Sequence, residues 1–154
     1  SKQPFIAARE RRHLLGWDDK RYFRVVDGLC RRGEMEIVKV KLGKGKPRIL
    51  YQIHGKNPGI KHEFYVHWIA EQLRNKGMEC TISRVGPDVQ AGRIAINVET
   101  GNSDIYGNIW IALSDFSKVI VCSDDEELVQ KVSREHGSPR VLCCLCWEAP
   151  GLCS

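Results

Sequence analysis

The sequence predicts an α/β fold, and three patterns in its second half lead to that prediction. Residues 60–76 carry apolar side chains at helical spacing and are followed by Gly77, a residue typical of the position just after a helix. Residues 94–98 form a short apolar run after a reversal at 91–92, which is typical of a hairpin. Residues 141–147 form a continuous apolar run, which is typical of a buried parallel strand.

The segments between these patterns complete an ordered set of elements. Residues 78–85 alternate as a first strand, residues 104–116 return to helical spacing, and residues 118–122 predict a short buried strand. Residues 124–136 have one apolar face and end at Gly137. We therefore expect a helix, a three-strand meander, a helix, a strand, a helix and a strand in this half of the chain.

The first third of the chain predicts a separate, smaller unit. Residues 19–33 have helical spacing, and the apolar side chains expected to face inward are Tyr22, Val25, Val26 and Leu29. Two alternating strands, 35–42 and 47–53, follow and are joined by a turn of two glycines and two lysines. The arginine-rich residues 5–15 would supply a preceding helix. A Gly and Pro break at 55–59 then places the boundary between two domains, 1–57 and 58–154.

Basic side chains gather on this first unit. A basic helix followed by a hairpin with a Gly and Lys tip resembles the recognition helix and wing of a winged helix-turn-helix domain, and the resemblance implies contacts with duplex DNA. An alternative is that the lysines only protect an exposed strand edge from pairing. The residues expected to contact DNA are Arg21, Arg24, Lys39, Lys41, Lys44, Lys46 and Arg48.

Two acidic residues are predicted to meet at the ends of neighbouring strands in the second half. Asp88 follows Pro87 at the start of one strand of the hairpin, and Glu99 follows the apolar run 94–98 on the other. Mg²⁺ needs few protein oxygens, since it keeps several waters and takes other ligands from substrate phosphates. Asp88 and Glu99 are therefore candidates to share one Mg²⁺ or Mn²⁺. The alternatives are an ordinary Pro-Asp turn and a solvated strand end.

This pattern, Pro87-Asp88, a hairpin and then Asn97-Val98-Glu99-Thr100-Gly101, resembles the PD-(D/E)XK nuclease superfamily, and especially its RecB-like branch. The resemblance implies a restriction-endonuclease-like core over residues 58–148. It makes Asp88 a metal ligand, puts Asn97 where a second acidic ligand is expected, and puts Glu99 where most members have lysine. A neutral amide can coordinate a metal through its oxygen but adds no charge, so Asn97 should weaken the cation site.

The first helix of the superfamily often supplies a further acidic ligand. Glu63 falls at that place, with His62 and His67 on either side. The resemblance therefore makes Glu63 a third metal ligand, whereas its position on a polar helix face is also that of an ordinary solvated carboxylate. Arg93 and Lys118 are the nearby candidates to replace the charge of the missing lysine.

Composition and charge indicate which kinds of partner and cellular location to expect. The formal net charge of +5 is modest, but the positive side chains concentrate early and an acidic cluster, 124–127, comes late, which favours a polyanionic partner. No segment has the length of a membrane span and no signal-peptide pattern opens the chain, so we expect a cytoplasmic protein without a membrane partner. Whether it forms a homodimer is left open.

The seven cysteines allow a zinc site as an alternative to a reduced core. The densest cluster is Cys143, Cys144 and Cys146, but adjacent strand residues face opposite sides and no second pair of ligands is evident. The odd count and apolar settings, such as those of Cys80 and Cys122, favour free thiols in the cytosol.

Two hypotheses follow for function. The first is a metal-dependent DNA endonuclease of the PD-(D/E)XK type, in which Asp88, Asn97 and Glu99 form the catalytic site. The second is a catalytically weakened module that keeps the nuclease fold for DNA binding, within a mobile-element or DNA-processing protein. Asn97 and the missing lysine favour the second hypothesis, and the retained Pro87-Asp88 pair favours the first.

Overall fold

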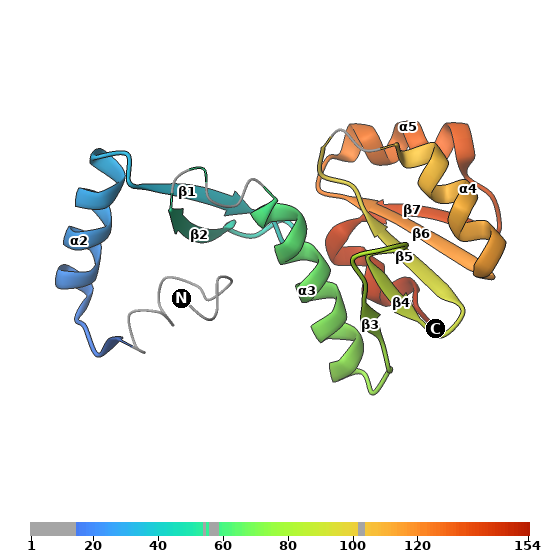
Figure 1. Ribbon diagram of the computed structural model, residues 1–154, viewed down its shortest axis with the longest axis horizontal. Coiled ribbons are helices and arrows are strands. Elements are labelled where there is room, and N and C mark those ends of the chain that lie inside the picture. The colour runs from blue at the N-terminus through green and yellow to red at the C-terminus, as the bar shows by residue number, and fades with distance from the viewer. Residues whose placement is uncertain (1–14, 54, 56–58, 102–103) are drawn as a thin grey trace. The chain divides into compact units, whose positions relative to one another are not determined.

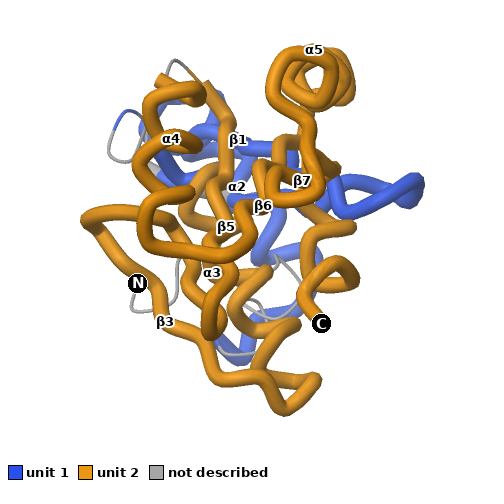
Figure 2. The backbone as a smooth tube through the Cα atoms, turned by 90° about the vertical axis from the view of Figure 1, so that its right-hand side faces the viewer, with its two compact units in different colours: residues 1–61 blue, residues 62–154 orange. Residues whose placement is uncertain are grey.

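The computed structural model describes residues 15–53, 55, 59–101 and 104–154 (Figure 1). Contacts between Cα atoms divide the chain into two compact units, residues 1–61 and residues 62–154 (Figure 2). No helix in the described part of the chain combines the length and the apolar character needed to cross a membrane. The expected helix at 5–15 lies outside the described residues, apart from Leu15.

The first unit contains one described helix and a hairpin. Helix α2 spans Asp19–Arg31 and is capped by Asp18, whose carboxylate accepts a hydrogen bond from the Arg21 N–H at 2.7 Å. Strands β1, Met35–Val40, and β2, Arg48–Ile53, pair antiparallel in the register Met35↔Ile53 to Val40↔Arg48. Helix and hairpin therefore follow the order predicted from the sequence.

Helix α2 has a narrower apolar face than the sequence predicts. Tyr22 and Val26 are buried, and they pack against Trp17, Cys30 and Met35. The prediction that Val25 faces inward is wrong, because its side chain is 39% exposed. Neighbouring helical residues point about 100° apart, so in a unit this small Val25 falls outside the sector that the hairpin covers.

The second unit is a five-stranded mixed sheet with helices on both faces. Helix α3, Ile60–Asn75, leads into a meander of β3, Thr81–Ile82, β4, Val89–Ala91, and β5, Ile94–Val98. The chain continues through α4, Ile105–Asp115, β6, Lys118–Ser123, α5, Glu126–His136, and β7, Val141–Leu145. It then turns into a 3₁₀ helix, η1, over Cys146–Leu152.

Sheet order follows chain order, β3-β4-β5-β6-β7. The first three strands are antiparallel, whereas β5, β6 and β7 run parallel. Helices α4 and α5 cover one face of the sheet, and α3 and η1 cover the other (Figure 1). The α/β class predicted from the sequence is confirmed, and the elements occur in the expected order.

Two strands of the second unit are shorter in the structure than predicted. The first strand was expected over residues 78–85, but only Thr81–Ile82 pairs with β4. The last strand was expected to reach Trp147, but pairing stops at Leu145 and Trp147 lies in the 3₁₀ helix. Apolar side chains alone predicted both extensions, and apolar residues also fill irregular segments that pack on a core.

Gly77 ends α3 as the sequence predicts, whereas the reversal expected at 91–92 lies one residue later, because Ala91 still pairs with Ile94. Gly77 has φ +80°, and the N–H of Met78 donates to the Leu73 carbonyl at 3.0 Å, which closes the end of α3. Gly92 has φ +59° in the two-residue turn between β4 and β5. This tight turn fixes the register that sets Asp88 beside the end of β5.

Candidate active site

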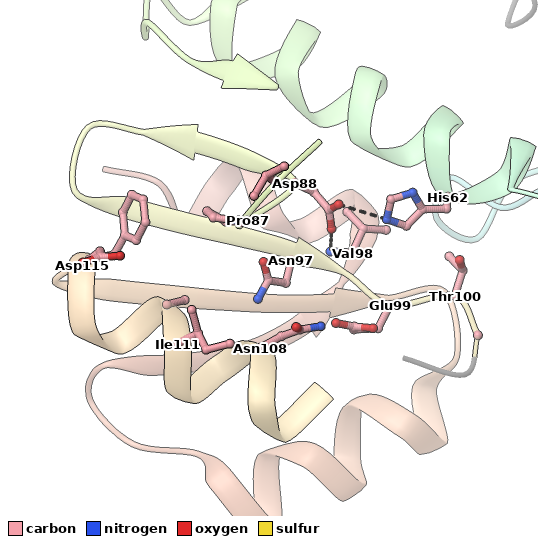
Figure 3. A pocket seen from close by; sticks show the side chains of 15 residues that line it. His62, Pro87, Asp88, Asn97, Val98, Glu99, Thr100, Asn108, Ile111 and Asp115 are labelled. Carbon is pink, nitrogen blue, oxygen red and sulfur yellow. Dashed lines mark hydrogen bonds and ion pairs between the residues drawn. The ribbon is translucent and has the colours of Figure 1, made fainter. Parts of the chain in front are cut away.

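A cavity of about 680 Å³ opens at the end of β5 within the second unit. Its walls come from the first turn of α3, the segment before β4, the end of β5 and one face of α4 (Figure 3). Its polar lining residues are His62, Asp88, Asn97, Glu99, Thr100, Asn108 and Asp115. Asp88, Asn97 and Glu99, which the sequence singled out, therefore line one cavity.

Asp88 lies one residue before β4, where the pairing with β5 has ended. One carboxylate oxygen, Oδ2, accepts a hydrogen bond from the backbone N–H of Val98 at 2.8 Å. The other oxygen, Oδ1, lies 3.2 Å from Nε2 of His62 (Figure 3). Both oxygens of this carboxylate thus have a partner, and the partners come from two different elements.

His62 is a functional candidate that sequence reasoning did not assign. It lies in the first turn of α3, and its side chain is 35% exposed. The hydrogen bond to Asp88 raises the pKa of the His62 imidazole, although desolvation of the partly buried ring opposes this shift. A polar residue next to Glu63 was the only available signal, because nothing in the sequence pairs residue 62 with residue 88.

Asn97 and Glu99 belong to the face of the sheet that α4 and α5 cover. Alternation along the strand puts them on the same side as Ala95, which is in the core. Both are nearly inaccessible, with 5% exposure for Asn97 and 3% for Glu99. In Figure 3 the Glu99 carboxylate is directed toward Asn108 of α4, and the Asp88 carboxylate is directed toward His62.

Backbone pairing fixes the position of Glu99. Its N–H donates to the Cys122 carbonyl on β6 at 2.8 Å, which continues the parallel ladder one residue beyond β5. The Glu99 side chain also borders a small internal space with apolar residues of α5, including Leu128 and Val132. A buried carboxylate is therefore held at the meeting point of two strands and two helices.

Glu63 does not belong to this cavity. It lies on α3 next to His62, but it is exposed and is not among the lining residues. Its negative charge makes a small contribution to the raised pKa of His62. The expected third carboxylate ligand therefore lies on the outer surface of the helix in this structure.

The two candidates for the missing lysine are at the other end of the strands. Arg93 precedes β5 and is four residues from Asn97, and Lys118 begins β6 and is three residues from Val121, the neighbour of Asn97. These separations correspond to about 10–13 Å along the strands. The Lys118 ammonium donates to the Leu152 carbonyl at 3.0 Å. Neither side chain lines the cavity, so His62 is the one basic group among the described residues that do.

The cavity's donor set is one that suits a hard divalent cation. Carboxylate and amide oxygens are the ligands that Mg²⁺ and Mn²⁺ take from proteins, and Mg²⁺ often uses only one or two carboxylates. No group of three or more His, Cys, Asp and Glu side chains in the described residues is arranged to hold a metal ion. A cation here would therefore depend on few protein ligands, Asp88 and Glu99 with the amide of Asn97.

The basic residues proposed for DNA contact all lie on the first unit with exposed side chains. Arg21 and Arg24 are on α2, and the Arg21 guanidinium lies 4.6 Å from the centre of the Trp17 ring. Lys44 and Lys46 are in the turn between the two strands. The others, Lys39, Lys41 and Arg48, are on or next to the hairpin strands.

Comparison of the chain with family models, with curated proteins and with solved structures finds no match.

Proposed function

We propose that the protein is a metal-dependent nuclease of the PD-(D/E)XK type, with Asp88, Asn97 and Glu99 as its catalytic site. One observation carries the proposal: two carboxylates and a carboxamide line the same cavity, and two of the three are almost fully buried. Burying a carboxylate costs free energy, so a buried carboxylate is not needed to stabilise a fold. Its presence at the wall of a cavity supports a role in binding or chemistry.

A bound divalent cation would supply Lewis-acid chemistry for phosphodiester hydrolysis. Asp88 and Glu99 would hold it, with the Asn97 oxygen as a neutral ligand or as a partner for a water molecule. Asn97 and Glu99 are nearly inaccessible to solvent, and low solvent access strengthens electrostatic interactions at their side chains. These roles are compatible with the fold, because the hairpin of β4 and β5 brings Asp88 beside the end of β5.

In this proposal the first unit binds duplex DNA. Arg21 and Arg24 lie on a helix, and Lys44 and Lys46 lie at the tip of a hairpin, so basic groups on two elements are available to phosphates. Such contacts give affinity and carry no sequence information. The first unit would then supply binding while the second supplies the chemistry.

A second candidate is a DNA-binding module that has the nuclease fold without catalysis. Two observations favour it. Asn97 brings no charge to the cation site, and both oxygens of Asp88 already have partners in Val98 and His62. In this case the carboxylates would stabilise the end of the meander, and the protein would bind DNA without cleaving it.

Nicking of supercoiled plasmid in Mn²⁺ tests the proposal. The variants Asp88→Asn and Glu99→Gln keep the shape of each side chain and remove its charge, and both should abolish nicking. Glu71→Gln changes an exposed carboxylate on α3 that does not line the cavity, so it should cleave like the wild type. No nicking by the wild type, or nicking that survives both cavity substitutions, would contradict the nuclease assignment.

A further inference from the structure

The partners of Asp88 assign a role to His62 that the sequence pattern does not contain. A carboxylate only accepts hydrogen bonds, so the His62 nitrogen at 3.2 Å from Oδ1 must carry a hydrogen. The second oxygen is held by the Val98 N–H, which belongs to the sheet and cannot move independently. The Asp88 carboxylate is thus held at both ends, once by the sheet and once by α3.

Among the described residues that line the cavity, no other basic side chain can donate a hydrogen bond to Asp88, because His62 is the only Lys, Arg or His. Arg93 and Lys118 lie at the opposite end of the strands, and Lys118 donates to the Leu152 carbonyl. If His62 is lost, the hydrogen bond from the Val98 N–H is the only one that still orients the Asp88 carboxylate among the described residues.

We propose that His62 is the positioning residue of this site: its imidazole N–H and the Val98 N–H together fix the orientation of Asp88 in the cavity. A carboxylate held by two donors loses rotational freedom, and a ligand fixed in advance binds its cation more tightly. The link to the cation rests on the proposed function. The link between His62 and the Asp88–Val98 hydrogen bond stands on geometry and can be measured without metal.

The most discriminating variants are His62→Gln and His62→Asn. The amide nitrogen of Gln is as many bonds from Cβ as Nε2 of His, so it can reach Oδ1, whereas the amide of Asn is one bond shorter. His62→Ala removes the donor completely. His67→Gln is a matched control, since His67 is an exposed histidine on the same helix and does not line the cavity.

The metal-free measurement is hydrogen exchange of the Val98 amide, followed by NMR. In His62→Asn and His62→Ala the exchange should be about fivefold faster than in the wild type, the change that corresponds to one hydrogen bond of about 1 kcal/mol. In His62→Gln and His67→Gln it should stay close to the wild-type rate. Unchanged Val98 exchange in both His62→Asn and His62→Ala, with the rest of the amide spectrum preserved, would overturn the proposal.

Calorimetric titration with Mn²⁺ and plasmid nicking separate this inference from the proposed function. Loss of the positioning residue should weaken Mn²⁺ binding about 10- to 100-fold, with rescue by His62→Gln. Tighter Mn²⁺ binding in His62→Asn would mean that His62 competes with the cation, which contradicts a positioning role. The wild type could neither bind Mn²⁺ nor nick plasmid while its Val98 exchange still responds to His62→Asn. That result would contradict the nuclease proposal and support the positioning role.

Discussion

The carboxylate of Asp88 accepts the backbone N–H of Val98 at 2.8 Å, just beyond the last residue pair of β4 and β5. The side chain thereby replaces the backbone carbonyl that a longer β4 would have offered to β5. Asp88 can therefore serve the fold as well as the chemistry. An Asp88 variant must be checked for stability before any loss of activity is assigned to the site.

Introducing a carboxylate at residue 97 should strengthen the proposed cation site. Asn97 is only 5% exposed and shares its cavity with Asp88 and Glu99, so Asn97→Asp adds a third negative charge in a poorly solvated place. Without metal the variant should unfold at a lower temperature than the wild type. With Mn²⁺ it should regain stability, because a hard cation gains more from an anionic oxygen than from an amide.

Thermal unfolding of Asn97→Asp in EDTA and in Mn²⁺, beside the wild type, measures this effect. Plasmid nicking should rise or first become detectable in the same variant. Equal stabilisation of both proteins by Mn²⁺ would mean that residue 97 does not face the cation. No nicking in either protein would favour the non-catalytic DNA-binding module.

The hairpin tip should contribute to the salt dependence of DNA binding. If Lys44 and Lys46 each contact one phosphate, their joint replacement by alanine should reduce the slope of log K against log salt by about 1.8. Fluorescence anisotropy with a labelled duplex at several salt concentrations measures the slope. Lys131→Ala, at an exposed position of α5, is the control and should leave the slope unchanged. An unchanged slope in the double variant would remove the tip from the DNA interface.

The His62–Asp88 contact should make stability depend on pH. The pKa of His62 is raised in the folded protein, first of all by the hydrogen bond to Asp88. The folded state therefore binds the proton more tightly than the unfolded chain, and the stabilisation is fully present below the unfolded pKa of about 6.5. It is lost as the pH rises through the folded-state pKa.

Urea unfolding of the wild type and His62→Gln between about pH 5 and pH 9 checks this sign. The difference in unfolding free energy should favour the wild type at the acidic end of that range and shrink toward the alkaline end. A difference that grows with pH would mean that His62 is neutral when paired with Asp88. His67→Gln should follow the wild type across the range.

Arg140 should stabilise the end of α4. Its guanidinium donates to the carbonyls of Leu113 and Phe116, each at 2.8 Å, and to the carbonyl of Ser117 at 3.2 Å. These groups lie at the C-terminal end of the helix, where a positive charge is favourable. Because Arg140 is exposed, we expect Arg140→Ala to cost about 1–2 kcal/mol of unfolding free energy. Arg134→Ala, at an exposed arginine of α5, should cost clearly less.

The buried thiols should resist alkylation in the folded protein. Burial raises the pKa of Cys144 to about 12, so at pH 8 only about one thiol in ten thousand is the reactive thiolate. The pKa of the Cys122 thiol is also raised, by its contact with Cys146 and by burial. Iodoacetamide followed by peptide mass spectrometry should show both cysteines unmodified until denaturant is added. Rapid labelling of Cys144 in the native state would contradict its buried position.

The sequence alone determined the helices and strands of the second unit and their order, apart from the 3₁₀ helix η1. Apolar spacing predicted α3 and α5, glycine predicted the end of α3 at Gly77, and a continuous apolar run predicted β7. These features are local, because a helix or strand repeats its pattern every few residues and a turn needs its special residue at one position. The hairpin also placed Asp88 correctly beside the end of β5, since a two-residue turn leaves little choice of register.

Only the tertiary structure decided which side chains meet. His62 and Asp88 are 26 residues apart, and Arg140 meets Leu113 across 27 residues, so no periodic pattern links either pair. The same holds for the exposed position of Glu63 and for the lysine candidate at 118, which lies far from the cavity along its strand. The periodic patterns of apolar residues that predict helices and strands show which face of each element is apolar. The contacts of individual polar groups depend on how the packed elements are placed around them.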